Sequence, residues 1–150
     1  MNVGGICNRS PVTIRKAEGL DRAAELMRDQ HVGYLVVVQP HVSGGLEVIG
    51  VLTDRDIVVS VVARQADPRA LTVGDVMTCQ PVVVDASSSA GSALNQMRRI
   101  GTRRVPVVSA TKALVGVLSL DDILKDLSLE MADVSGTIQK EQTMERALRP

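Results

Sequence analysis

Aromatic residues are almost absent from this sequence: Tyr34 is the only one, and the 150 residues contain no Trp or Phe. Proteins that hold single-stranded nucleic acids stack bases on aromatic side chains, so this composition excludes that mode of binding. A surplus of charge is also missing, because 17 Lys and Arg residues balance 17 Asp and Glu residues. A neutral chain lacks the basic surplus that phosphate backbones attract, so we expect no nucleic-acid partner.

Cysteines and long apolar runs are equally scarce. Cys7 and Cys79 are too few for a disulfide framework, and with His31 and His41 they lack the spacing of a zinc site, so we predict no metal. No run approaches the roughly 18 apolar residues of a membrane span, and the first ten residues lack a secretory signal layout. We therefore expect a cytoplasmic protein without a membrane partner.

An internal repeat is the most informative feature that the sequence does contain. Sliding the chain against itself by about 70 positions aligns some 35 residues without a gap. Val3-Gly4 then falls on Val73-Gly74, and Met27-Arg28 falls on Met97-Arg98. After a loop that is longer in the first copy, Gly50-Val51-Leu52 matches Gly116-Val117-Leu118. We predict a first motif over residues 1–65, a linker over 66–72, a second motif over 73–127 and a tail over 128–150.

Each copy shows the same order of predicted elements. A short strand (12–14 and 82–84) precedes an amphipathic helix with apolar residues at 20, 23, 24 and 27, repeated at 90, 93, 94 and 97. Ser87, Ser88 and Ser89 are suited to cap the second of these helices. Two strands follow (35–38 and 47–52; 105–108 and 113–118), and then a helix, predicted over 54–64 in the first copy although its β-branched residues oppose it.

A strand-helix-strand-strand-helix unit leaves one face of its small sheet uncovered. A second copy can cover that face. We therefore predict an α+β fold in which two β-α-β-β-α motifs pack sheet to sheet with pseudo-twofold symmetry. In the tail, Ile123, Leu127, Met131, Val134 and Ile138 recur at helical spacing, which predicts a helix within 121–149 that Gly136 can interrupt.

These residues resemble the paired cystathionine-beta-synthase (CBS) domains, also called a Bateman module, over about residues 3 to 127. The most specific segments are Gly50-Val51-Leu52-Thr53-Asp54-Arg55-Asp56-Ile57 and Gly116-Val117-Leu118-Ser119-Leu120-Asp121-Asp122-Ile123, with the strand entries Val32-Gly33-Tyr34-Leu35 and Thr102-Arg103-Arg104-Val105-Pro106-Val107. The first copy departs from the family pattern, since Gly5 and Cys7 stand where the second copy has Asp75 and Met77. The tail after Ser128 has no counterpart in the family.

The resemblance implies ribose-binding residues. In the family, a Ser or Thr three residues before an Asp marks an adenosine site, where the carboxylate accepts hydrogen bonds from both ribose hydroxyls. Thr53 with Asp56, and Ser119 with Asp122, match this pattern. A diol presents two donors to the two carboxylate oxygens, so the contact is bidentate and charge-assisted. The same pattern also describes a helix capping box that needs no ligand, and both roles can coexist.

The resemblance also implies contacts to phosphate and base. Arg103, Arg104 and Arg55 are the phosphate candidates, because guanidinium groups bind phosphate bidentately; a cluster of Arg residues is otherwise typical of a solvated helix end. Backbone groups at two strand entries would read the adenine edge, with Tyr34 flanking it; these base-pocket candidates are Pro11, Val12, Thr13, Gly33, Tyr34, Pro81, Val82 and Val83. Edge-strand geometry explains the prolines equally well, and core packing explains Tyr34.

We therefore expect a regulatory protein that is not an enzyme, since the sequence shows neither a nucleophile-base constellation nor a P-loop. It is predicted to need no cofactor and to bind AMP, ADP, ATP or a related adenosine ligand in the cleft between the motifs. Its output would pass through an unidentified effector protein or through a homodimer. Two alternatives stay open: a structural docking module with vestigial ligand sites, and an enzyme or nucleic-acid binder that uses the same scaffold.

Overall fold

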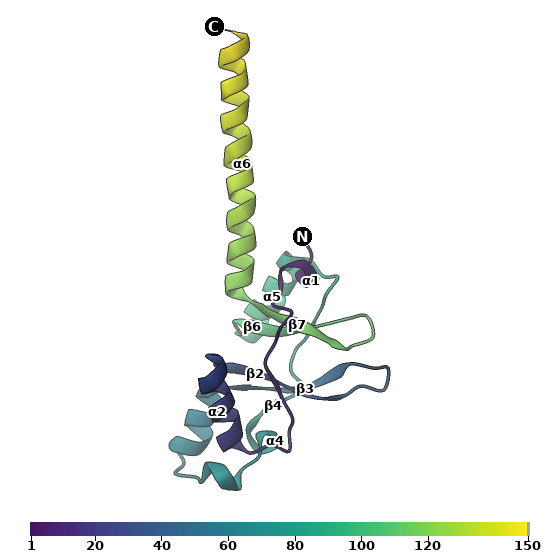
Figure 1. Cartoon of the computed structure of the whole chain (residues 1–150), viewed down its shortest axis with the longest axis vertical. Coiled ribbons are helices and arrows are strands. Elements are labelled where there is room, and N and C mark those ends of the chain that lie inside the picture. The colour runs from purple at the N-terminus through teal and green to yellow at the C-terminus, as the bar shows by residue number, and fades with distance from the viewer. Residues whose placement is uncertain (150) are drawn as a thin grey trace.

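Two small sheets, each built mainly from one copy of the repeat, form the body of the computed structural model, which describes residues 1–149 (Figure 1). The first sheet has the order β1 (Thr13–Ile14), β2 (Tyr34–Pro40), β3 (Leu46–Thr53) and β4 (Thr78–Cys79). The second has the order β5 (Val84–Asp85), β6 (Arg104–Val108) and β7 (Leu114–Ser119). In each sheet the first strand runs parallel to the second and the next pair is antiparallel, which confirms the predicted α+β fold.

The amphipathic helices of the two copies are α2 (Leu20–Gln30) and α5 (Ala90–Ile100). Each buries an alanine and a methionine of the repeated stripe, Ala23 and Met27 in α2 and their equivalents in α5. Ser89 caps α5 as predicted, because its side chain accepts a hydrogen bond from the Ser92 amide at 3.1 Å. The repeat of sequence is therefore a repeat of local structure.

The second helix of the first copy is shorter and less regular than predicted. It begins as α3 (Asp54–Ile57) and continues as the π-helical turn η1 (Val58–Val62), where the Ala63 amide donates to the Val58 carbonyl oxygen at 3.0 Å. The segment is a run of β-branched residues, whose side chains crowd the preceding turn of a regular α-helix. The predicted end at residue 64 is thus corrected to 62.

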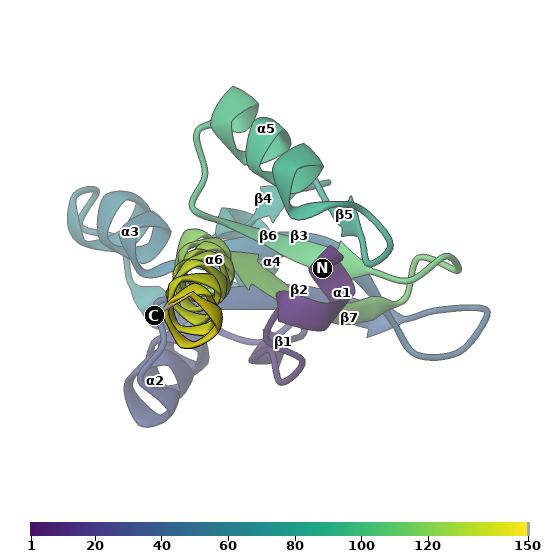
Figure 2. The ribbon, with the colours of Figure 1, turned by 90° about the horizontal axis from the view of Figure 1, so that it is seen from above.

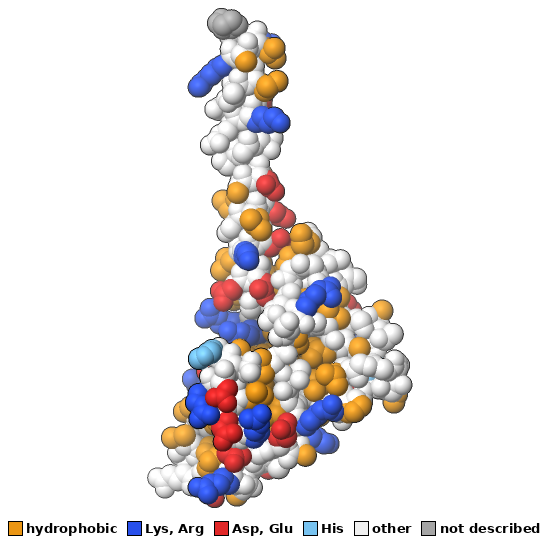
Figure 3. Space-filling view, in the orientation of Figure 1, with side chains coloured by type: hydrophobic (Ala, Val, Ile, Leu, Met, Phe, Trp, Pro, Cys, Tyr) orange, Lys and Arg blue, Asp and Glu red, His pale blue; other side chains and the backbone are white. Residues whose placement is uncertain are grey.

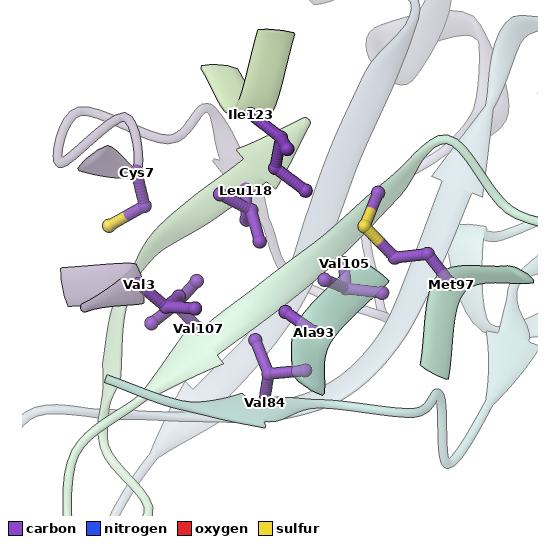
Figure 4. Close-up of a cluster of buried hydrophobic side chains, with 9 residues drawn as sticks. All are labelled: Val3, Cys7, Val84, Ala93, Met97, Val105, Val107, Leu118 and Ile123. Atoms are coloured by element: carbon purple, nitrogen blue, oxygen red, sulfur yellow. The ribbon is translucent and has the colours of Figure 1, made fainter. Parts of the chain in front are cut away.

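Two short helices that the sequence analysis did not predict are exchanged between the copies. α1 (Val3–Ile6) buries Val3 in the core of the second sheet, where it lies beside Val107 (Figure 4). α4 (Val73–Val76) buries Val73 in the core of the first sheet. The Gly4 amide donates to the Ala86 carbonyl oxygen at 2.8 Å, and the equivalent Gly74 amide donates to the Lys16 carbonyl oxygen at 2.9 Å.

The exchanged segments continue as edge strands. β4 pairs with β3, and Asn8 pairs with Val117 of β7 through two backbone hydrogen bonds, each of 2.9 Å. A Cβ at Gly50 or at Gly116 would overlap the neighbouring edge segment, which explains why glycine stands at both positions. The predicted boundary between residues 65 and 73 divides the sequence repeat. It does not separate the two cores, because Val3 lies in the core of the second sheet and Val73 lies in the core of the first.

The second core is closed by the start of α6 (Leu120–Leu148), whose Ile123 is buried (Figure 4). The rest of α6 projects away from the body as one continuous helix (Figures 1 and 2). This confirms the predicted tail helix, and Gly136 does not interrupt it. None of the helices between residues 1 and 149 is long and apolar enough to cross a membrane.

Candidate functional site

A cleft of about 400 Å³ opens between the two sheets, and both copies contribute to its walls. The first copy supplies side chains from β2, β3 and the start of α3, and the second supplies the segment before β5 and the entry to β6. We call it the Asp56 cleft; it is lined by Tyr34, Val51, Thr53, Asp56, Thr78, Gln80, Pro81, Val82, Ile100, Thr102, Arg104, Val105 and Pro106. It brings together Thr53, Asp56, Tyr34, Pro81, Val82 and Arg104 of the predicted site residues.

Asp56 is held in the cleft by a complete capping box. The Thr53 amide donates to Asp56 Oδ2 at 2.9 Å, and the Asp56 amide donates to Thr53 Oγ1 at 3.1 Å. Within residues 1–149, Asp56 Oδ1 accepts no hydrogen bond. The cap therefore fixes the carboxylate and leaves it acceptor capacity for a further donor.

Asp122 has the same cap but different surroundings. The Ser119 amide donates to Asp122 Oδ2 at 2.9 Å, and the Asp122 amide donates to Ser119 Oγ at 3.1 Å. Asp122 lines a hollow of about 250 Å³ between α1 and the foot of α6, beside Met1 and Lys125. Neither Ser119 nor Asp122 shares a cleft with a predicted base or phosphate residue among the described hollows.

A second cleft, of about 370 Å³, lies on the first copy's side of the same interface. We call it the Pro11 cleft; its lining is Asn8, Ser10, Pro11, Val12, Gln30, His31, Val32, Gly33, Tyr34, Arg104 and Val117. It contains the predicted base-pocket residues Pro11, Val12, Gly33 and Tyr34. No carboxylate lines it, so it offers no charged acceptor for a ribose diol.

Tyr34 and Arg104 line both clefts. They occupy equivalent positions at the starts of β2 and β6, and the Arg104 Cζ lies 6.0 Å from the centroid of the Tyr34 ring. This distance permits a cation–π interaction. Burial raises the pKa of the Tyr34 phenol above its ordinary value, and the charge of Arg104 opposes that rise. The phenol is therefore neutral near pH 7 and can act as a hydrogen-bond donor.

The remaining predicted residues lie elsewhere. Arg103 lines a separate hollow between α5 and the foot of α6. Arg55 lines none of the described hollows, and neither do Thr13 and Val83. The sequence analysis missed seven residues that line the Asp56 cleft, namely Val51, Thr78, Gln80, Ile100, Thr102, Val105 and Pro106. Sequence position could have indicated Gln80 and Thr102, because Gln80 directly precedes Pro81 and Thr102 lies two places before Arg104.

Metal-ligating side chains are dispersed. Among residues 1–149, no group of three or more His, Cys, Asp or Glu side chains is placed to hold a metal ion. Cys7 is buried, and this burial raises the pKa of its thiol above the ordinary value. Cys79 is exposed on β4.

The exchanged repeat and its two interfacial clefts define a paired regulatory module of the CBS type. The sequence model of the CBS domain matches residues 3–63 and 73–129, so the chain belongs to the CBS domain family. The second matched region ends at residue 129, within the first ten residues of α6.

Curated and solved relatives agree with this assignment. Hypoxic response protein 1 of Mycobacterium tuberculosis is 35% identical over 127 residues, which are 85% of this chain and 81% of the relative. A solved structure of Hypoxic Response Protein I with two coordinated zinc ions has a TM-score of 0.70 and 34% identity, covering 83% of this chain and 98% of that chain. A CBS domain protein of Pyrobaculum aerophilum complexed with AMP has a TM-score of 0.74 and 25% identity, covering 89% and 99%.

Proposed function

We propose that this protein is a non-catalytic regulatory module that binds an adenosine-containing ligand, such as AMP, ADP or ATP, in the Asp56 cleft. One observation carries the proposal: a fixed carboxylate with a free oxygen and a guanidinium group line the same cleft. A ribose diol matches the first and a phosphate matches the second. The AMP complex of the Pyrobaculum relative supports this ligand class.

The rest of the Asp56 cleft suits a nucleobase. Val51, Ile100 and Val82 supply apolar contacts, and the backbone before β5 carries polar groups at Gln80 and Pro81. The volume of about 400 Å³ falls within the range of small-molecule sites. We place the base against this wall, the ribose on Asp56 and the phosphate at Arg104.

The Pro11 cleft is the weaker candidate for a nucleotide, because no carboxylate lines it. The proposed roles of Arg55 and Arg103 in phosphate binding, and of Ser119 and Asp122 in ribose binding, stay predictions. Signalling to an effector protein, or through self-association, is likewise part of the proposal: a ligand shifts such an equilibrium only by binding one state more tightly.

A structural docking module is the second candidate function. The observation that favours it is that both capping boxes are complete without a ligand. In that case the Ser/Thr and Asp residues serve only to begin α3 and α6.

Calorimetric titration of the purified chain separates the two functions. We expect AMP, ADP or ATP to bind with a stoichiometry of one per chain, and GMP to bind at least tenfold more weakly. Saturation at 100 times the dissociation constant should stabilise the fold by about 2.7 kcal/mol, which thermal unfolding detects. If neither calorimetry nor thermal unfolding detects an adenine nucleotide at millimolar concentration, the docking module is the better account.

A further inference from the structure

We call residues 127–148 the free part of α6, because every side chain there is exposed among the described residues 1–149. Ile123 is 4% exposed, but every side chain from Leu127 to Arg149 is exposed, including Met131 at 73% and Val134 at 62%. Most helical stability in proteins comes from packing an apolar face, and this part of α6 buries none of its apolar side chains among residues 1–149. A second molecule covering that face would supply the missing packing.

Exposed apolar side chains form a stripe along one face of α6, and Leu129 and Met144 lie outside this stripe. Hydrophobic patches are visible near the foot and at the tip of the projecting helix in Figure 3. The stripe, which we call the α6 stripe, consists of Leu124, Leu127, Met131, Val134 and Ile138, spaced by three, four, three and four residues. It is nearly symmetric about Met131. Leu124 and Ile138 each lie seven residues from Met131, and Leu127 and Val134 lie four and three residues away. A second α6 running in the opposite direction therefore presents an apolar side chain opposite each member of the stripe.

The foot of α6 carries a hollow of about 330 Å³ between this helix and α5. Its lining includes the apolar side chains of Leu94, Met97 and Leu120 and the two basic side chains of Arg98 and Arg103. Neither arginine forms an ion pair within residues 1–149. Figure 3 shows basic side chains gathered at the foot of the helix.

The outer end of α6 carries acidic side chains, whose charge is complementary to the two arginines of this hollow. The spacing of the stripe continues past Ile138 to Glu141, Glu145 and Leu148, so the same face changes from apolar to acidic and ends on an exposed leucine. Glu141 lies ten residues beyond Met131, and the first turn of α6 begins about as far before it. An antiparallel pair centred on Met131 would therefore set Glu141 of one copy beside the foot of α6 of the other copy, where Arg98 and Arg103 line the hollow.

We propose that α6 pairs antiparallel with α6 of a second copy of this chain, and that its outer end binds the hollow between α5 and α6 of that copy. The stripe supplies the apolar contact, and Glu141 and Glu145 face Arg98 and Arg103 across the interface. The pairing is independent of the nucleotide proposed for the Asp56 cleft. Parallel pairing would bring Glu141 of one copy against Glu141 of the other, so that like charges would face each other and the arginines would be left without acidic partners.

Sedimentation equilibrium of the full chain, without nucleotide, tests the apolar contact. We expect a dimer of 16.0 kDa chains at micromolar concentration. Val134→Asp should weaken it at least tenfold. Ala132→Asp is the matched control, because Ala132 is exposed on α6 outside the stripe, and it should leave the dimer unchanged. The highest concentration tested is about 100 micromolar, roughly a hundredfold above the expected dissociation constant. A wild-type protein that is still a monomer there would overturn the proposal. Equal effects of Val134→Asp and Ala132→Asp would also overturn it.

Charge reversal tests the direction of pairing. Glu141→Lys with Glu145→Lys should weaken the dimer several-fold, as should Arg98→Glu with Arg103→Glu, and the chain that combines all four changes should recover it. Within one chain, Glu141 is about 30 Å along the helix from the foot of α6, so recovery must come from contacts between copies. Dimers that are indifferent to both reversals, or that the combined variant fails to restore, would overturn the antiparallel arrangement.

Discussion

Tyr34 and Arg104 occupy the same position in the two copies of the repeat, and they meet across the pseudo-twofold axis with 6.0 Å between the guanidinium carbon and the ring centroid. A perfect duplication would place two identical side chains here. In this chain one position carries an aromatic ring and the other a cation, so the two copies are not equivalent at this point. Both side chains line both clefts.

Replacing Arg104 should weaken phosphate-bearing ligands selectively. Arg104→Leu removes the guanidinium group from the Asp56 cleft, and we expect AMP to bind about tenfold more weakly, since a charge-assisted hydrogen bond is worth about 1.5 kcal/mol or more. Adenosine, which lacks the phosphate, should keep its affinity. Arg99→Leu is the control, because Arg99 lines none of the described hollows. Equal losses for AMP and adenosine would place the phosphate elsewhere.

Replacing the capped carboxylates should separate ribose binding from helix capping. Asp56→Ala should cost roughly 1.5 to 3 kcal/mol of nucleotide binding, about 10- to 100-fold in affinity. Asp75→Ala is a matched control: the Thr72 amide donates to the Asp75 carboxylate at 2.8 Å in the same kind of box, outside the described clefts. Each variant loses one of the two hydrogen bonds of its capping box, so urea denaturation should show a small and similar loss of folding stability for both.

Asp122→Ala belongs in the same titration. If it weakens binding as much as Asp56→Ala does, the ribose role predicted for Ser119 and Asp122 holds despite their separate hollow. If Asp56→Ala binds AMP as tightly as Asp75→Ala does, the Thr53 box is only a helix cap.

The glycines beneath the exchanged edge strands should resist substitution. At Gly50 an added Cβ would stand 2.5 Å from the Met77 sulfur and 3.0 Å from the Thr78 carbonyl oxygen, and at Gly116 it would overlap the Asn8 carbonyl oxygen. We expect Gly116→Ala to cost 2 kcal/mol or more, about the range for strained or overpacked sites, because the obstacle is backbone. Gly91→Ala in α5 meets nothing within 4 Å and should be neutral or slightly stabilising in urea denaturation. A similar result for both would argue against the close approach.

Ultraviolet titration of the phenol tests the burial of Tyr34 directly, because Tyr34 is the only aromatic residue of the chain. Burial raises its pKa above the ordinary value of 10.0 in the folded protein. The folded state therefore holds the phenolic proton more tightly than the unfolded state, and the resulting stability is complete below pH 10 and is lost as the pH rises above it. We expect phenolate absorbance to appear at a lower pH in urea than in buffer. In Tyr34→Phe, the free energy of unfolding should fall less steeply as the pH rises above 10 than it does in the wild type. Coincident titrations in urea and in buffer would contradict this prediction.

Local chemistry made much of the molecule predictable. The helical spacing of Leu20, Ala23 and Met27 recurs in α5, Ser89 caps that helix, and the stripe from Ile123 to Ile138 marks α6. Each signal depends on residues a few places apart, so the sequence determines it without knowledge of packing. The misjudged end of η1 has the same local origin, because crowding within a β-branched run decides whether the turn is regular.

The arrangement of the site was decided by contacts between distant segments. The packing of the two copies brings Pro81 and Arg104 of the second copy into one cleft with Asp56 of the first, and the exchange of α1 puts Asp122 in a hollow beside that helix. Two copies with nearly the same motif thus acquire different surroundings. Periodicity and capping patterns carry no information about which half a short helix joins; that choice depends on which apolar core buries Val3 and Val73, and only the tertiary structure makes it.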